Sequence, residues 1–349
     1  MNKLIIAEKP SVAQRLASSL AEGDYKRFSF EGVSYYELKN GEDIIYVVAA
    51  AGHLFTIRQK EGSKGFPIFE IEWVPSYKAN KNAYFTKKYL DTIAEIGKRC
   101  SLFINACDYD IEGTVIGTNI IKFIQNGDVN SEVKKGQLLR MKFSTTTKED
   151  LLESYRNINP FDENNFNAGE TRHILDWMWG INMSRALMRS LYANGIKKIV
   201  SIGRVQGPTL AILAKRELEI KDFVPKPYWK IFAVFKGVTF ENSRNEIFEK
   251  KVADEALERS RQKEAFVQKV ENKEVIERPL PPFDLTSLQV EASRVFGMDP
   301  SRTLAIAQSL YERAYISYPR TSSQKLPYSL NLPRIIYEIG KNERYKALA

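Results

Sequence analysis

The chain has 349 residues, of which 43% are hydrophobic and 27% are charged. This balance is typical of a globular protein long enough for two to four domains, and it excludes a wholly disordered chain. The net charge of +9 favours a polyanionic partner such as nucleic acid, although many proteins carry a similar surplus only for solubility.

The cysteines and the apolar runs narrow the class of protein further. Cys100 and Cys107 flank a strand-like apolar run, so we interpret them as reduced core residues rather than as a disulfide or a zinc pair. The longest uninterrupted apolar run, 44–51, is far too short to span a bilayer. We therefore expect a cytoplasmic protein that does not insert into a membrane.

Short apolar runs alternate with helical patterns in the amino-terminal part of the chain. Strands are expected at 4–7, 44–51 and 102–107, and helices at 12–20 and about 113–125. This alternation predicts an α/β domain with a mostly parallel sheet. Ligands bind at the carboxyl ends of the strands in such sheets, and Glu8, His53 and Asp108 all follow predicted strands.

Alternating carboxylates follow the third predicted strand. Asp108, Asp110 and Glu112 are spaced by two, so in an extended segment they project on one side and can share a hydrated Mg²⁺. The alternative is an acidic loop that caps the next helix, where carboxylates are favoured anyway. Glu8 and Lys9 are interpreted either as a proton carrier or metal ligand with a phosphate contact, or as an ordinary charge pair at a strand end.

The middle of the chain has a helical apolar pattern over 168–192 and a second helix from near Pro208 to about Phe223. In the first helix Arg172 and Asp176 would meet on one face, and a plain salt bridge is the alternative to a role in DNA binding. Arg204, just before the second helix, could meet a backbone phosphate together with the helix N-terminus.

The composition of the chain changes over residues 225–282. Strand-like aromatic residues lie at 228–235, and a highly charged stretch lies at 245–268, to which we assign no chemistry. A capping box starting at Thr286 predicts a helix that ends at Gly297, and another helix follows Pro300.

A strand is then predicted at 315–318. Tyr318 precedes a proline and is expected to be extended, with Arg320 on the same side of the chain. A phenol beside an arginine can attack a phosphodiester while the developing negative charge is neutralised. Tyr315 is the local competitor for this role, and a tyrosine that only fills the core is the ordinary alternative.

These segments together resemble the type IA DNA topoisomerases, and the residues of the motifs are most similar to those of the archaeal topoisomerase I/III branch. The resemblance runs from the first residue to about Pro327 and rests on these motifs in family order: Glu8-Lys9-Pro10-Ser11, Gly52-His53, Asp108-x-Asp110-x-Glu112-Gly113, Ala168-Gly-Glu-Thr-Arg172-His-Ile-Leu-Asp176, Ser201-Ile-Gly203-Arg204-Val-Gln206, Pro282-Phe-Asp-Leu-Thr286 and Tyr318-Pro-Arg320-Thr321.

The resemblance implies a domain organisation. It places a Rossmann-like Toprim domain at 1–150, the first part of a helical DNA-binding base domain at 151–223, a β-rich arch segment at 224–282 and an incomplete, helical active-site tyrosine domain at 283–349. It also implies that Arg172, Asp176, Ser201, Arg204, Gln206 and His53 contact single-stranded DNA, although a cap role for Gln206 stays open.

The activity implied by the resemblance is that of an isomerase. Tyr318 would attack single-stranded DNA to give a 5′-phosphotyrosyl enzyme and a free 3′-hydroxyl. Arg320 would stabilise the transition state, and Glu8 and Lys9 would control the proton on the leaving oxygen. Asp108, Asp110, Glu112 and Glu8 would hold Mg²⁺, which is needed mainly for rejoining.

The resemblance also implies a monomer that changes the linking number of negatively supercoiled DNA. No ATP would be needed, which fits the absence of a Gly-x-x-x-x-Gly-Lys-Ser/Thr loop.

Two departures leave alternatives open. Ser322 stands where the family often has an acidic residue, and the chain ends sooner after Tyr318 than family members do. A truncated fragment that binds single-stranded DNA without relaxing plasmid is therefore a second hypothesis. A Toprim nuclease or primase is a third, but it leaves Tyr318 and the segment around Arg204 unexplained.

Overall fold

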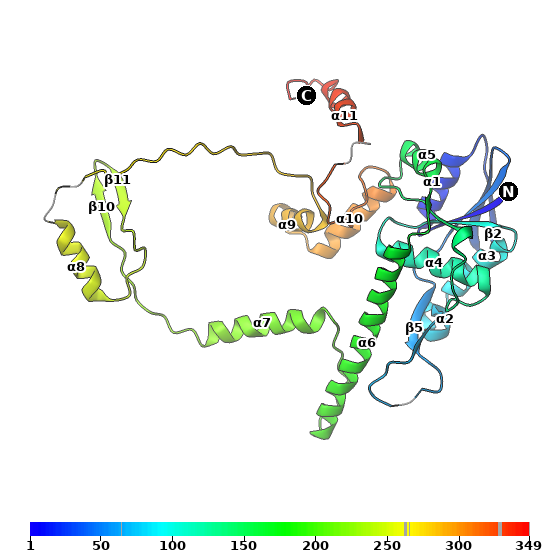
Figure 1. The fold of residues 1–349 in the computed structure, drawn as a ribbon, viewed down its shortest axis with the longest axis horizontal. Coiled ribbons are helices and arrows are strands. Elements are labelled where there is room, and N and C mark those ends of the chain that lie inside the picture. Colours follow the sequence, from blue (N-terminus) through cyan, green and yellow to red (C-terminus); the bar gives the residue numbers. More distant parts are fainter. Residues whose placement is uncertain (64, 262–263, 265, 327–329, 349) are drawn as a thin grey trace. The chain divides into compact units, whose positions relative to one another are not determined.

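A seven-stranded mixed sheet, in the order β2-β3-β4-β1-β7-β8-β9, is the main feature of the computed structural model (Figure 1). The structure describes residues 1–63, 65–261, 264, 266–326 and 330–348. The strands of this sheet are β1 (Asn2–Ala7), β2 (Lys26–Phe30), β3 (Val33–Asn40), β4 (Asp43–Ala49), β7 (Leu102–Ala106), β8 (Leu138–Arg140) and β9 (Asn159–Pro160). The central pairs β4–β1, β1–β7 and β7–β8 are parallel, which confirms the predicted α/β class, while the outer pairs are antiparallel.

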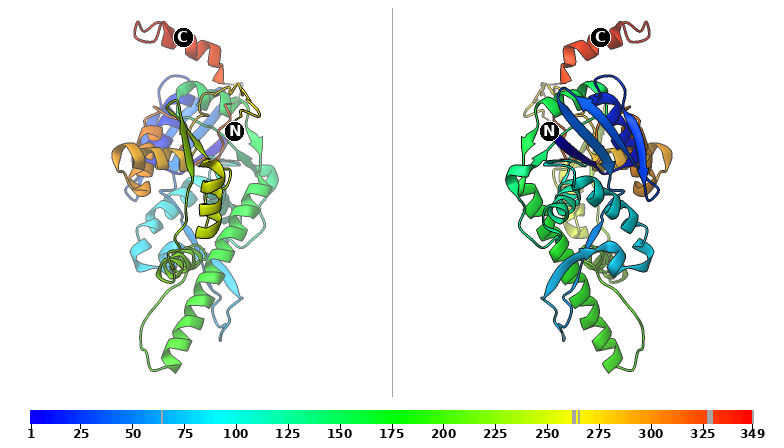
Figure 2. Two further views of the ribbon diagram at one scale, coloured as in Figure 1. Left: turned by 90° about the vertical axis from the view of Figure 1, so that its left-hand side faces the viewer. Right: turned by 90° about the vertical axis from the view of Figure 1, so that its right-hand side faces the viewer.

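Helices cover both faces of this sheet because its central strand is apolar on both sides. Leu4 and Ile6 of β1 pack with α3 (Thr86–Gly97) and α4 (Ile111–Asn126). Ile5 and Ala7 face α1 (Pro10–Leu20) and α5 (Lys148–Arg156) on the other side (Figure 2). A strand that is buried on both faces has a continuous apolar sequence. The apolar run from Leu4 to Ala7 therefore allowed β1 to be predicted.

The remaining elements lie around this layer or in a separate unit. They are β5 (Phe55–Gln59), β6 (Ile71–Pro75), α2 (Ser76–Ala79), α6 (Glu163–Ala193), α7 (Gln206–Lys221), β10 (Phe232–Phe235), β11 (Val238–Glu241), α8 (Lys250–Arg261), α9 (Leu285–Phe296), α10 (Pro300–Glu312) and α11 (Leu332–Gly340), with short 3-10 turns at Lys81–Ala83 and Lys135–Gln137.

The chain divides into two compact units. The first comprises Met1–Arg204 and Leu280–Ala349, and the second is Val205–Pro279. In the second unit β10 and β11 form an antiparallel pair, and α8 occupies part of the charged stretch predicted at 245–268. The four predicted domains do not coincide with these units, because the predicted base domain 151–223 crosses the division after Arg204, and they stay a prediction. Residues 327–329 and 349 of the predicted tyrosine domain lie outside the described part of the chain.

Two local predictions were wrong. The cap of α9 is Asp284 rather than Thr286, because the Asp284 carboxylate accepts the amide hydrogen of Ser287 and the Ser287 hydroxyl in turn accepts that of Asp284. The residues from Tyr315 to Tyr318 form no strand. The amide of Tyr318 instead donates one hydrogen bond to the carbonyl oxygen of Ser144, at 2.8 Å. One isolated hydrogen bond does not form a β-ladder.

Candidate active site

The register of three parallel strands brings polar residues to one edge of the sheet. Ala7 of β1 pairs with Ala49 of β4 and with Ala106 of β7. The residues that follow these strands therefore lie side by side, with Glu8 directly after β1 and Asp108 two residues beyond Ala106. The predicted gathering of distant segments at the carboxyl edge of the sheet is confirmed for these two carboxylates.

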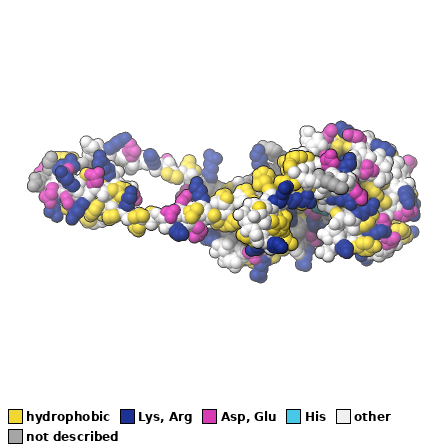
Figure 3. All heavy atoms as spheres, turned by 90° about the horizontal axis from the view of Figure 1, so that it is seen from below, with side chains coloured by type: hydrophobic (Ala, Val, Ile, Leu, Met, Phe, Trp, Pro, Cys, Tyr) yellow, Lys and Arg dark blue, Asp and Glu magenta, His cyan; other side chains and the backbone are white. Residues whose placement is uncertain are grey.

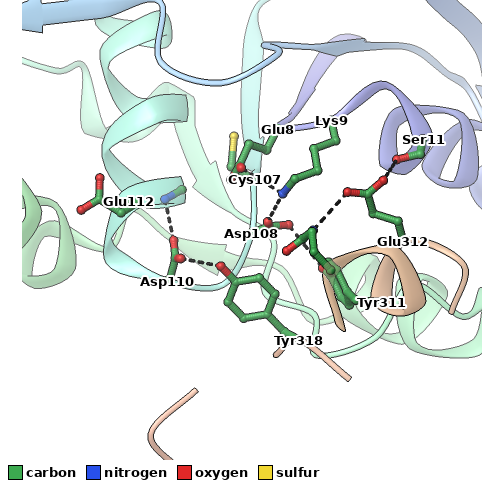
Figure 4. A network of polar contacts seen from close by, with 12 residues as sticks. Glu8, Lys9, Ser11, Cys107, Asp108, Asp110, Glu112, Tyr311, Glu312 and Tyr318 are labelled. Carbon is green, nitrogen blue, oxygen red and sulfur yellow. Dashed lines mark hydrogen bonds and ion pairs between the residues drawn. The ribbon is translucent and has the colours of Figure 1, made fainter. Parts of the chain in front are cut away.

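Lys9 lies between the two carboxylates (Figure 4). Its Nζ is 2.5 Å from Asp108 Oδ2 and 3.0 Å from Glu8 Oε1, and Asp108 is only 2% exposed. Burial and then the charge of Asp108 raise the pKa of Glu8, in spite of the lowering effect of Lys9. Burial lowers the pKa of Lys9, but the charges of Asp108 and Glu8 outweigh it, so the pKa is raised and the ammonium form is favoured.

Asp110 connects the acidic loop to the predicted nucleophile. Its Oδ1 accepts the amide hydrogen of Gly113 at 2.7 Å and so caps α4, which realises the capping alternative for this residue. Its Oδ2 accepts the hydroxyl hydrogen of Tyr318 at 2.5 Å (Figure 4). Burial, followed by the hydrogen bond to Asp110, raises the pKa of Tyr318, so the phenol is held in its protonated form.

Gly113 allows the acidic loop to turn tightly into α4. A Cβ atom at this position would lie 2.3 Å from the carbonyl oxygen of Asp108, which no side chain tolerates. The glycine that ends the acidic motif is therefore required by close backbone approach.

The segment that carries Tyr318 is fixed to the sheet domain by buried contacts. Tyr311, at the end of α10, is fully buried, and its ring meets that of Tyr318 edge to face at 5.2 Å between centroids. The Tyr311 hydroxyl is 3.4 Å from Asp108 Oδ1, and its carbonyl accepts the hydroxyl hydrogen of Thr146 at 2.9 Å. The next residue, Glu312, accepts the hydroxyl hydrogen of Ser11 on α1 at 3.0 Å.

Arg140 forms hydrogen bonds to the backbone around the start of the acidic loop. Its guanidinium is buried and donates hydrogen bonds of 2.7 to 3.1 Å to the carbonyl oxygens of Asn105, Cys107, Asp108 and Met141. These carbonyls belong to the end of β7, to the start of the acidic loop and to the residue after β8. Arg140 therefore fixes the backbone from which Asp108 projects.

Glu112 lies apart from the other two carboxylates of its motif (Figure 4). Its Oε2 is 2.8 Å from His173 Nε2 and 3.2 Å from His53 Nε2, and its Oε1 is 3.4 Å from Arg172 Nη1. The hydrogen bonds from His173 and then His53 lower the pKa of Glu112. The carboxylates that share a direct network are thus Glu8 and Asp108 through Lys9.

The predicted DNA-binding residues fall in different surroundings. Arg204 forms an ion pair with Asp176 through Nε and Oδ1, whereas the intrahelical contact from Arg172 to Asp176 is long, at 3.9 Å. Ser201 is exposed after α6, and Gln206 is exposed at the start of α7 in the second unit. On the face drawn in Figure 3, lysine and arginine side chains lie among acidic and apolar ones on both units.

A cleft of about 930 Å³ lies within the first unit. Its lining includes Glu8, Lys9, His53, Asp108, Asp110, Glu112, Arg172, His173, Asp176, Tyr318, Arg320 and Thr321. Tyr318 and Arg320 thus face the same cavity, while Tyr315 is 73% exposed and is not among the lining residues.

Sequence reasoning missed three residues at this site. Arg140 lies in the segment Leu-Leu-Arg-Met-Lys-Phe at 138–143, and Tyr311 lies in the helix predicted after Pro300, seven residues before Tyr318. His173 is the only histidine besides His53, and that scarcity was the available signal.

Two family descriptions match the sequence. The Toprim domain matches residues 3–146, and a family described as DNA topoisomerase matches residues 160–349. Within the part of the chain that the structure describes, none of the helices has both the length and the apolar character needed to cross a bilayer.

Individual relatives agree with these matches. The chain is 44% identical to DNA topoisomerase 1 of Pyrococcus horikoshii, with 99% of the chain and 50% of the relative covered. It is 41% identical to DNA topoisomerase 1 of Methanothermobacter thermautotrophicus, with 99% of the chain and 47% of that relative covered. It therefore spans about half the length of the curated relatives it matches. The solved structure of full-length topoisomerase I from Thermotoga maritima superposes with a TM-score of 0.61 at 26% identity, over 96% of the chain and 52% of that protein.

Proposed function

The chain belongs to the type IA DNA topoisomerase family, and from this premise we propose that it cuts and rejoins single-stranded DNA by transesterification at Tyr318. One observation carries the proposal: the Tyr318 hydroxyl donates a 2.5 Å hydrogen bond to Asp110 inside a cleft that Arg320, Lys9 and Glu8 also line. A tyrosine that only filled the core would have no reason to face a cavity with this set of charges.

The arrangement of the chain's own groups supports a balanced reaction. Asp110 accepts the phenolic proton as the Tyr318 oxygen bonds to phosphorus, and the bond from phosphorus to the 3′-oxygen breaks. The leaving oxygen takes a proton from Glu8, whose raised pKa favours the protonated acid. Arg320 and Lys9 neutralise the charge on the phosphoryl oxygens.

Rejoining is the same reaction in reverse. One phosphodiester is exchanged for another, so no ATP is needed in either direction. Glu8 then takes back the proton of the attacking 3′-hydroxyl, and Asp110 returns its proton to Tyr318.

The acidic residues fit a divalent cation. Glu8, Asp108 and Asp110 offer only carboxylate oxygens, which Mg²⁺ prefers, and the charges of Asp108 and Asp110 contribute to the raised pKa of Glu8. This mutual repulsion shows a local excess of negative charge that Lys9 offsets only in part. We propose that Asp108, together with whichever of Glu8 and Asp110 is ionised, holds Mg²⁺, which when bound would supply positive charge beside the scissile phosphate. The contacts of Glu112 favour a separate role for that residue.

We further propose that a single strand follows the cleft past His53, Arg172 and Asp176, and that Ser201 and Arg204 of the same unit also contact it. We propose a DNA contact for Gln206, in the second unit, from the family resemblance alone. Phosphate contacts from arginine position a strand without reading its sequence. The substrate of the whole protein would be negatively supercoiled DNA, acted on in the cytoplasm by a monomer without ATP.

A covalent-adduct assay tests this function. The purified chain is mixed with a labelled single-stranded oligonucleotide, and SDS-stable adduct is measured for the wild type, Tyr318→Phe and the matched control Tyr315→Phe. We expect loss of the adduct only in Tyr318→Phe, with binding of the oligonucleotide retained. Adduct that persists in Tyr318→Phe and disappears in Tyr315→Phe would move the nucleophile to Tyr315.

A further inference from the structure

Both histidines of the chain converge on one carboxylate oxygen. His53 and His173 are the only histidines among the 349 residues, and they approach the same Oε2 atom of Glu112 with their Nε2 atoms, at 3.2 and 2.8 Å. Their rings meet edge to face, with 4.9 Å between centroids. Two histidines that are 120 residues apart in the sequence therefore share one site.

Three separate segments supply this cluster. His53 follows β4, Glu112 lies in the first turn of α4, and His173 lies on α6. Close packing of the two helices sets the distance, because a Cβ on Gly169 of α6 would lie 2.8 Å from the carbonyl oxygen of Ile111. The site is thus built by the packing of the first unit and not by one mobile loop.

The donor atoms have the spacing of a metal site. One ring nitrogen of each histidine and a Glu112 oxygen all lie within 4.8 Å of one another. Bonds of about 2.0–2.1 Å at a tetrahedral Zn²⁺ place neighbouring donors roughly 3.4 Å apart. The two nitrogen–oxygen distances of 2.8 and 3.2 Å need only small side-chain shifts to reach that value.

The surroundings of Glu112 favour this use. Arg172 approaches the other oxygen, Oε1, at 3.4 Å and leaves Oε2 to the histidines. Trp73 packs edge to face on His173, at 5.6 Å between centroids, and restricts its ring.

The donor set differs in kind from that of the proposed Mg²⁺ site. Two imidazoles and one carboxylate suit Zn²⁺ and related transition-metal ions, whereas Mg²⁺ prefers oxygen ligands alone. Thiols do not compete, because Cys107 is fully buried and burial raises the pKa of Cys100 to about 12.

We propose that His53, His173 and Glu112 form a second metal site, which binds one Zn²⁺ ion per chain. The ion ties the loop after β4 to α4 and α6 and places a positive charge on the wall of the cleft. Three protein ligands leave one coordination position open to water or to a phosphate oxygen of DNA. The proposal does not depend on the function proposed for Tyr318.

Cobalt spectroscopy and zinc competition test the site directly. Co²⁺ is titrated into the metal-free chain in excess Mg²⁺, and visible absorption is recorded before and after Zn²⁺ is added. We expect saturation at one Co²⁺ per chain with the strong d–d bands of a low-coordinate site, followed by their loss as Zn²⁺ displaces Co²⁺. Weak bands typical of six oxygen ligands, or no saturable binding, would overturn the proposal.

Variants locate the binding. We expect His173→Gln, His53→Gln and Glu112→Gln each to weaken Zn²⁺ binding more than about 100-fold, because loss of a ligand should exceed the loss seen for outer-shell partners. Glu163→Gln, which removes an exposed carboxylate at the start of the same helix α6, should leave it unchanged.

One further variant separates the two metal sites. Asp110→Asn should keep Zn²⁺ affinity while it weakens Mg²⁺ binding. Zn²⁺ affinity that falls in Asp110→Asn but not in the histidine variants would assign the ion to the acidic site and refute the second site. Because these experiments measure metal binding, the proposed Zn²⁺ site can be refuted while the adduct assay still supports Tyr318 as the nucleophile.

Discussion

The ion pair between Lys9 and Asp108 gives a prediction whose size follows from burial. Asp108 is 2% exposed and Lys9 Nζ lies 2.5 Å from its Oδ2, so Lys9→Met leaves a buried carboxylate without its counter-charge. Removal of one partner of a buried pair costs about 3–5 kcal/mol. We expect a loss of stability in this range in the absence of divalent ions.

A double-mutant cycle isolates the pair. Asp108→Asn in the Lys9→Met background removes the unpaired charge, so the double variant should recover most of the loss and show a coupling of at least about 2 kcal/mol. Lys87→Met is the matched control, because Lys87 and Asp91 lie 2.6 Å apart but both are partly exposed, and little or no loss is expected there.

The assay is urea unfolding combined with hydrogen exchange at the amides of β1 and β7, which reports the first unit by itself. Mg²⁺ should stabilise Lys9→Met more than the wild type, because the site has become more negative. Single-variant losses that simply add in the double variant would refute the reasoning that Lys9 is the counter-charge of Asp108.

Three further predictions concern neighbouring groups. Since the folded-state pKa of Glu8 is raised by burial and by Asp108, Glu8 contributes stability that is present below its unfolded pKa and is lost as pH rises through the folded pKa. Glu8→Gln should therefore gain stability relative to the wild type between pH 4 and pH 7 without divalent ions, and unfolding midpoints that move in parallel over this range would contradict it. Arg140→Met should leave the buried carbonyls of the acidic loop unpaired and lower both stability and adduct yield, while exposed Arg216→Ala should not; unchanged hydrogen exchange in the loop would count against the positioning role. Arg204→Ala should lower the salt slope of single-strand binding by about 0.7, the value of one phosphate contact, and an unaltered slope would return Arg204 to its ion pair with Asp176.

The polar edge of the sheet could be predicted because a buried strand is a continuous apolar run and the polar residues directly follow it in the sequence. The run from Leu4 to Ala7 is apolar on both faces, and Glu8 and Asp108 come at the ends of parallel strands, so their proximity follows from topology. The antiparallel strands β2 and β3 were not predicted, since their side chains are mostly polar or exposed.

The division of the acidic motif could not be predicted from spacing. Alternating carboxylates share a side only in an extended segment, but α4 begins at Ile111, so Glu112 turns toward His53 and His173 while Asp110 becomes a cap. The positions of Arg140 and Tyr311 depend on long-range packing, which a local pattern does not contain. Tyr318 was found through its motif, although the strand expected around it does not form.

Mapping the residue to which the DNA is attached identifies the nucleophile itself. The trapped adduct is digested with nuclease and trypsin, and the peptide 314–320, which contains both Tyr315 and Tyr318, is fragmented in a mass spectrometer. We expect a residual nucleotide linked through a 5′-phosphate to Tyr318 and an unmodified Tyr315. A nucleotide on Tyr315 or on any other residue, or linkage through a 3′-phosphate, would contradict it.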